Sequence, residues 1–243
     1  MPTASHLTTA AHLTTASAAH LAPDPRSQCE RYTDATYAKM VGDGERTSAY
    51  AAAIRRHAPG RVCLDIGTGA LAVLALQAAE AGAAHVYAVE ANAAAAEAAV
   101  ATVAAAGFSD RISVLRGYST DVELPARVDL LLHEIIGEVA GAEGVVAAVA
   151  DARRRHLAPE AASSGAPVSV PARAVSLVAP AEFPGSEYFA SLEFPMLAAP
   201  GARALKLPSL PRRLLLDAAA PFESLDFSQA APQPTQTVRP PRL

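Results

Sequence analysis

The chain has 243 residues, of which 51% are hydrophobic, and a formal net charge of −4 at pH 7. This length accommodates one domain with an appendage, and the slightly acidic balance gives no general attraction to nucleic acid or to an anionic membrane. Its two cysteines cannot form a disulfide framework, and it has no uninterrupted apolar run of about 20 residues, the length of a transmembrane helix. These properties favour a globular protein of a reducing compartment.

The first 28 residues have low complexity. The pentapeptide HLTTA occurs at residues 6–10 and again at residues 12–16, in a segment rich in alanine, serine and threonine. Such a composition offers few side chains for a packed core. We expect residues 1–28 to be a disordered leader, with plastid targeting as a minor alternative.

The composition changes near residue 29. The stretch RTSAYAAAIRRH at residues 46–57 predicts an amphipathic helix that starts after Arg46, and we expect Arg46 itself in the turn before the helix, facing the first strand. Pro59 and Gly60 end this helix.

The stretch RVCLDIGTGAL at residues 61–71 predicts a buried strand, a tight turn and the start of a helix. Gly67 and Gly69 let backbone N–H groups approach a ligand that a Cβ would keep away. Asp65, at the end of the strand, can accept hydrogen bonds from a ligand. The combination is typical of a nucleotide site at the carboxyl edge of a parallel sheet. The glycines alone would also suit a purely structural turn.

A second strand at residues 85–89 leads into Glu90, 25 residues after Asp65. This separation corresponds to one βαβ unit, so both acidic residues should lie at the same sheet edge. Glu90 is then placed to bind the two ribose hydroxyls of an adenosine. The alternative is a carboxylate that only interacts favourably with a helix N-terminus.

Helices expected at residues 71–81 and 93–106, the second capped by Asn92, alternate with strands at 111–115 and 128–133. This order predicts an α/β fold, a Rossmann-like doubly wound parallel sheet, over residues 29–160. Residues 161–229 contain valine-rich alternating stretches bounded by prolines and predict a partial, mostly β, barrel-like region. Residues 230–243 are rich in proline and glutamine, and we expect a disordered tail.

Two glutamates follow the fourth strand. Glu143 comes nine residues after Glu134 across a glycine-containing turn, so a hairpin could bring both carboxylates to one pocket. Like charges repel, but a guanidinium between them offers paired N–H donors to each. On these residues alone the structural alternative is favoured, in which Glu134 ends a strand and Glu143 lies on a solvated helix.

These motifs together resemble the protein arginine methyltransferase family, whose members have the class I fold and use S-adenosylmethionine. The resemblance covers about residues 37–159. It rests on an M-x-x-D-x-x-R-T-x-x-Y segment, an Asp-x-Gly-x-Gly turn, the acidic end of the second strand and a double-glutamate hairpin. Here these are Met40, Asp43, Arg46, Thr47 and Tyr50; Asp65, Gly67 and Gly69; Glu90; and Glu134 and Glu143.

The resemblance implies transfer of a methyl group from S-adenosylmethionine to a guanidinium nitrogen of protein arginine. Glu134 and Glu143 are the implied catalytic residues, because they would orient the guanidinium, and Met40 joins them in binding the substrate. Arg46 would bind the methionine carboxylate of the cofactor and Glu90 its ribose. The implied cofactor-binding residues are Arg46, Asp65, Gly67, Gly69, Glu90, Ala91, Ser119 and Thr120.

The chain departs from the family pattern at several positions. Leu71 replaces the third glycine of the turn, Ile135 and Ile136 replace a Trp-Met pair, and Thr120 replaces an acidic contact to adenine. The chain has no tryptophan, so the Thr-His-Trp substrate loop of the family is absent. The C-terminal region is too short for the complete barrel. No dimerisation arm is visible, which leaves the oligomeric state open.

Two alternative functions remain open. The first is a methyltransferase of the same fold that acts on a small molecule or RNA, although the segment after the fourth strand lacks the Asn/Asp-Pro-Pro-aromatic motif of amino-methylating nucleic-acid enzymes. The second is a cofactor-binding pseudoenzyme that serves as an interaction module. We expect a protein substrate, no membrane or nucleic-acid partner, and a cytoplasmic or nuclear location.

The histidines do not predict a metal site, because His57, His85 and His156 lack ligand spacing. His133, beside Glu134, could be a general base. We favour the alternative, in which His133 is hydrogen-bonded to the backbone.

Overall fold

The computed structural model describes residues 43–137, 139–182, 211–229 and 235–236. The expected leader and Met40 lie outside these ranges. Within them, no helix is both long enough and apolar enough to cross a membrane.

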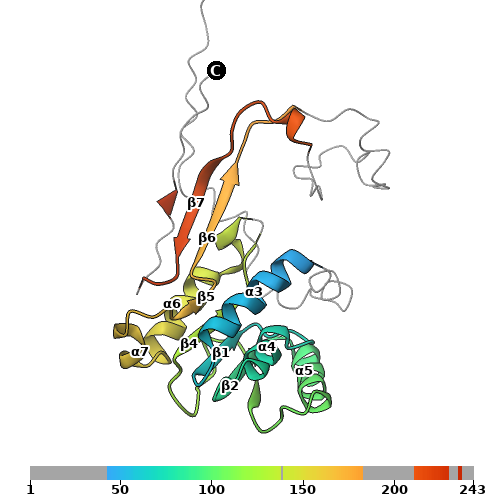
Figure 1. Cartoon of the computed structure of the whole chain (residues 1–243), viewed down its shortest axis with the longest axis vertical. Helices are drawn as coiled ribbons and strands as arrows, with labels where there is room; N and C mark the ends of the chain where they lie inside the picture. The colour runs from blue at the N-terminus through green and yellow to red at the C-terminus, as the bar shows by residue number, and fades with distance from the viewer. Residues whose placement is uncertain (1–42, 138, 183–210, 230–234, 237–243) are drawn as a thin grey trace, which may run out of the picture.

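A five-stranded parallel sheet with the order β3-β2-β1-β4-β5 forms the centre of the molecule (Figure 1). The chain runs outward from β1 to β3 and then returns to the other side of β1. This reversal places a topological switch point between β1 and β4, where α/β proteins bind ligands. The predicted fold class is confirmed. The strands are β1 (Val62–Ile66), β2 (His85–Glu90), β3 (Ile112–Arg116), β4 (Leu130–His133) and β5 (Ser169–Val170).

Helices cover both faces of this sheet. One face packs against buried residues of α3 (Gly44–His57), α4 (Val73–Glu80) and α5 (Ala93–Ala105). The other packs against α6 (Val145–Arg155). Alternation along β1 divides its side chains accordingly, since Cys63 faces the first group and Leu64 the second. Shorter helices are η1 (Ala140–Glu143), α7 (Pro159–Ser163) and η3 (Arg212–Leu214).

Two helix starts follow from capping. The Asn92 side chain accepts a hydrogen bond from the Ala95 backbone N–H and caps α5, as the sequence predicts. The Asp43 side chain accepts from the backbone N–H of Arg46, so α3 begins at Gly44. Arg46 therefore lies in the first turn of α3, and the prediction that it precedes the helix is wrong.

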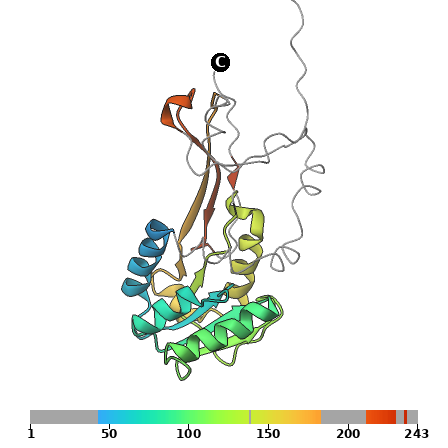
Figure 2. The same cartoon turned by 90° about the vertical axis from the view of Figure 1, so that its right-hand side faces the viewer.

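A second, antiparallel sheet contains β6 (Arg173–Val178), β7 (Ala220–Asp226) and β8 (Thr235–Gln236). β6 and β7 extend as a long pair away from the parallel sheet (Figures 1 and 2). This is the mostly β region that the sequence predicts. Two expectations change. β5, which lies beyond residue 160, belongs to the parallel sheet, and the sequence did not predict it because a two-residue strand has no detectable periodicity. β8 lies within residues 230–243, the tail expected to be disordered.

Candidate active site

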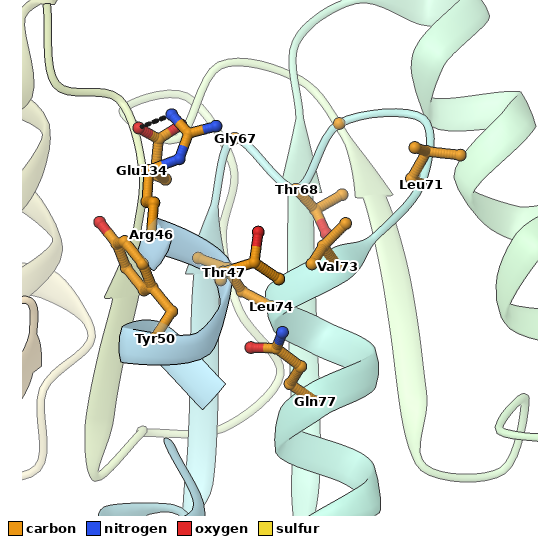
Figure 3. A pocket seen from close by; sticks show the side chains of 11 residues that line it. Arg46, Thr47, Tyr50, Gly67, Thr68, Leu71, Val73, Leu74, Gln77 and Glu134 are labelled. Atoms are coloured by element: carbon orange, nitrogen blue, oxygen red, sulfur yellow. Dashed lines mark hydrogen bonds and ion pairs between the residues drawn. The ribbon is translucent and has the colours of Figure 1, made fainter. Parts of the chain in front are cut away.

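Two adjoining cavities lie at the carboxyl ends of β1, β2 and β4, and Gly67 lines both. The larger, of about 350 Å³, lies between β2, the loop after β3 and the start of α6. The smaller, of about 80 Å³, lies between α3, the glycine turn and α4 (Figure 3). This is the sheet edge at which the sequence predicts a nucleotide site.

Gly67 is required by its surroundings. Its φ of +75° lies in the left-handed region, and a Cβ at this position would come within 2.8 Å of Cγ2 of Ile135. The turn can therefore approach the segment after β4 only because residue 67 has no side chain. Gly69 lines the smaller cavity.

Glu90 lies at the wall of the larger cavity and is only 5% exposed. One carboxylate oxygen accepts from the Gly69 backbone N–H and the other from the Asn92 N–H, each at 2.8 Å. A carboxylate oxygen has two lone pairs, so each retains one for a ligand hydroxyl. Three other predicted cofactor residues line the same cavity, namely Ala91, Ser119 and Thr120.

Asp65 occupies a different environment from Glu90. It is 1% exposed and lines neither cavity, and its Oδ2 accepts a hydrogen bond from the Thr68 hydroxyl at 2.7 Å. Oδ1 has no hydrogen-bond partner within the described chain. Burial raises the pKa of Asp65 to about 7, although the Thr68 hydrogen bond opposes that shift. Asp65 therefore stabilises the glycine turn through its hydrogen bond with Thr68 and does not face either cavity.

Arg46 and Glu134 line the smaller cavity and form an ion pair there. Nη1 of Arg46 lies 3.0 Å from Oε1 of Glu134, as Figure 3 shows. Burial raises the pKa of Glu134, the charge of Arg46 opposes this shift, and the charge of Glu143 adds to it. Glu134 thus binds the guanidinium of Arg46, so the residue predicted to bind the carboxylate of the cofactor already pairs with a carboxylate of its own chain.

Glu143 ends η1 and lines the larger cavity, whereas Glu134 lines the smaller one. The charge of Glu143 is close enough to help raise the pKa of Glu134, after burial, which is the larger cause. In the described part of the segment, residues 134–137 and 139–143, the two residues are joined by loop and by the single turn of η1, with no β-strand. Gly144, with φ of +83°, then turns the chain into α6.

His133 is fully buried and lines neither cavity. Its Nε2 lies 3.0 Å from the Ser169 hydroxyl oxygen, and that hydroxyl donates to the Pro171 carbonyl. Nε2 therefore carries the proton and donates to Ser169. Burial lowers the pKa of His133 to about 3, so a general-base role finds no support, and the hydrogen-bond partner is a side chain instead of the expected backbone.

Sequence reasoning missed Arg155, in the last turn of α6. Its guanidinium donates to the carbonyls of Ser119 at 2.6 Å and Val122 at 3.0 Å, and to the carboxylates of Glu123 and Asp151 at 2.8 Å each. It thereby holds the loop that lines the larger cavity. The sequence shows only a run of three arginines, which does not identify the partner of any of them.

Tyr50 belongs to the M-x-x-D-x-x-R-T-x-x-Y segment, and the sequence alone indicates no role for it. Its hydroxyl donates to the His133 carbonyl at 3.1 Å, and burial raises its pKa. Tyr50 thus ties α3 to the end of β4.

No protein-family model matches the chain. Probable histone-arginine methyltransferase 1.3 of Arabidopsis thaliana is 39% identical over 124 residues, which are 50% of this chain and 23% of the relative. Probable protein arginine N-methyltransferase 6 of the same plant is 34% identical over 159 residues, 64% of this chain and 34% of the relative. This chain is related to the protein arginine methyltransferases. It spans about a quarter to a third of the length of these curated relatives.

Solved structures of protein arginine methyltransferases agree with this relationship. The crystal structure of protein arginine methyltransferase 10 of Arabidopsis thaliana is 32% identical, with a TM-score of 0.57, over 65% of this chain and 43% of that chain. A structure described as PRMT6-SAH shares the fold at 23% identity and a TM-score of 0.62, over 80% of this chain and 66% of that chain.

Proposed function

We propose that this chain binds S-adenosylmethionine and transfers its methyl group to a guanidinium nitrogen of protein arginine. The observation that carries the proposal is the arrangement around Gly67. On one side Glu90 lies in a cavity with lone pairs available to a ligand, and on the other Glu134 pairs with the guanidinium of Arg46, from its own chain, at 3.0 Å. The relatives named histone-arginine and protein arginine methyltransferases support the same activity.

The larger cavity suits a nucleoside cofactor. Its volume of about 350 Å³ lies within the range of small-molecule sites. Glu90 would bind the ribose hydroxyls, while Ser119 and Thr120 would flank the adenine. Arg46 would bind the carboxylate of the methionine part. Bound in this way, the cofactor supplies a methyl group activated by its sulfonium.

The two glutamates would orient the substrate. A guanidinium nitrogen is a poor nucleophile because its lone pair is delocalised over the group. Glu134 and Glu143 would hold positive charge on the two nitrogens that do not react, which leaves the third richer in electrons and fixes its line of approach. Orientation of this kind can lower a barrier by up to about 7–11 kcal/mol in the best cases. The substrate would have to displace or share the contact that Arg46 makes with Glu134.

The first test is cofactor binding. We expect calorimetry to give a micromolar dissociation constant for S-adenosylhomocysteine and the purified chain. The Glu90→Ala variant should show no binding, because it loses the ribose contact. Glu97→Ala, on the exposed face of α5, is the matched control and should bind normally. A folded wild-type chain that fails to bind would contradict the proposal.

The second test is methyl transfer to arginine-containing peptides. Glu134→Gln and Glu143→Gln remove one charge each with little change of shape, so each should retain cofactor binding and lose about 100-fold or more in kcat. Full turnover by either variant would remove that residue from the mechanism. Cofactor binding without transfer by the wild-type chain would instead favour the pseudoenzyme.

A further inference from the structure

Glu223, in β7, is a buried carboxylate that lines neither cavity and lies far along the chain from the residues that do. It is 4% exposed, and none of the ion pairs in the described part of the chain involves it. A buried charge of this kind is costly unless hydrogen-bond donors compensate for it. Its Oε2 accepts from the backbone N–H of Gly141 at 2.8 Å and lies 3.5 Å from the Ser176 hydroxyl.

Ser176, on the neighbouring strand β6, completes the arrangement. Its hydroxyl oxygen accepts from the backbone N–H of Ala140 at 2.8 Å, which leaves its proton free to point toward Glu223. Ala140 and Gly141 are the first two residues of η1, and η1 has no capping side chain of its own. Two residues of the second sheet, 36 and 82 positions away in sequence, therefore cap this short helix.

The capped helix is the one that ends in Glu143. It is a single turn, so the position of Ala140 and Gly141 determines where Glu143 enters the larger cavity. The fit is close, because a Cβ on Gly141 would come within 2.8 Å of Oε1 of Glu223. β6 and β7 approach the parallel sheet at the base of their long pair, next to this segment (Figure 2).

We propose that Glu223, with Ser176, is a positioning residue for Glu143, which rests on the proposed function of Glu143 in holding the substrate guanidinium. Glu223 acts through two backbone amides and touches neither substrate nor cofactor. The second sheet thus contributes to the reaction by holding the carboxylate-bearing turn against the end of the parallel sheet.

The test compares Glu223→Ala, Glu223→Gln and Ser176→Ala. Alanine leaves the Gly141 amide without its acceptor, whereas glutamine keeps a side-chain oxygen of the same reach. Misplacement of an orienting group is costly, so we expect kcat for an arginine peptide to fall about 10-fold or more in Glu223→Ala, with partial recovery in Glu223→Gln. The affinity for S-adenosylhomocysteine should stay within about twofold in all three. Ser224→Ala, the exposed neighbour in β7, is the control and should behave like wild type.

A second readout does not depend on activity. Hydrogen exchange of the amides in residues 139–144 should accelerate in Glu223→Ala and remain unchanged in Ser224→Ala, while exchange in β1 and β4 stays as in wild type. Unchanged exchange, or unchanged kcat beside an active wild type, would overturn the proposal. Equal losses in the alanine and glutamine variants, with faster exchange throughout the chain, would also overturn it, since that pattern marks a general structural role. A wild-type chain without transfer activity would refute the proposed function, and the exchange result would still decide whether Glu223 holds η1.

Discussion

Asp65 and Glu90 both lie at the ends of neighbouring parallel strands, yet their carboxylates have different surroundings. Glu90 accepts two backbone hydrogen bonds beside a cavity, whereas Asp65 accepts one from Thr68 and is enclosed by the turn. Hydrogen bonds favour the ionised form of a carboxylate and burial disfavours it. For Asp65 burial is the larger effect, which raises its pKa to about 7.

The pKa of Asp65 predicts how stability depends on pH. Between about pH 4, its ordinary pKa, and about 7, the folded chain holds a proton that the unfolded chain releases. Protonated Asp65 therefore contributes stability at low pH, and that contribution is lost as the pH rises through this window, by at most about 1.4 kcal/mol per pH unit. Asp65→Asn cannot titrate, so the free energy of unfolding of wild type minus that of the variant should decrease from pH 4.5 to pH 8.

Urea unfolding of both proteins at several pH values measures this difference. The difference is needed because His133 acts in the opposite sense: burial lowers its pKa to about 3, so its contribution increases as the pH rises toward about 6.5. Parallel pH profiles for wild type and Asp65→Asn would show that Asp65 is ionised in the folded chain throughout.

At the scale of elements, the end of α6 holds the loop after β3, which lines the larger cavity together with Glu90. Arg155 makes hydrogen bonds to two carbonyls of the loop after β3, and its side chain is only 14% exposed. Arg154, the preceding residue, pairs only with Asp151 among the described residues and is 71% exposed. Of these two adjacent arginines, Arg155 binds the loop after β3, whereas Arg154 contacts a residue of its own helix.

We expect Arg155→Ala to weaken S-adenosylhomocysteine binding about 10-fold, because charge-assisted hydrogen bonds that order the loop are worth a few kcal/mol and tenfold corresponds to 1.4 kcal/mol. Arg154→Ala should bind like wild type. Calorimetric titration of the two variants checks this. Equal effects in both would mean that the overall charge of α6, and not the loop contact, governs affinity.

At the scale of the whole molecule, the two sheets share a core. Phe227, just after β7, is fully buried in the same cluster as Leu64 and Leu131 of the parallel sheet. Its ring meets the His133 ring edge-on at 4.7 Å, and its backbone N–H donates to the Ala172 carbonyl. The second sheet is therefore joined to the first by packing as well as by the chain.

Phe227→Ala should lower the free energy of unfolding by about 3–5 kcal/mol, because it leaves a cavity between the sheets. Phe227→Leu should cost less, and Leu216→Ala, which is 68% exposed, should change stability by less than about 0.5 kcal/mol. Urea unfolding followed by circular dichroism measures all three. A near-neutral Phe227→Ala would show that the sheets do not depend on this contact.

The sequence by itself determined the elements that depend on neighbouring residues. Strand and helix periodicity predicted the parallel sheet, Asn92 predicted the start of α5, and the glycine turn with Glu90 predicted the edge where the cavities lie. Each of these signals involves residues within one turn or one βαβ unit, where chain geometry leaves few alternatives.

Only the tertiary structure decided which charged groups meet. The contacts of Arg46 with Glu134, of Arg155 with the loop after β3, and of Glu223 with Gly141 join residues 88, 36 and 82 positions apart. Such pairings depend on the order of the strands in the sheet and on how far each loop reaches. A local sequence pattern indicates neither of these. Glu134 and Glu143 line different cavities for the same reason. The position of Glu143 depends on the length of η1 and on the contacts that η1 makes with the second sheet.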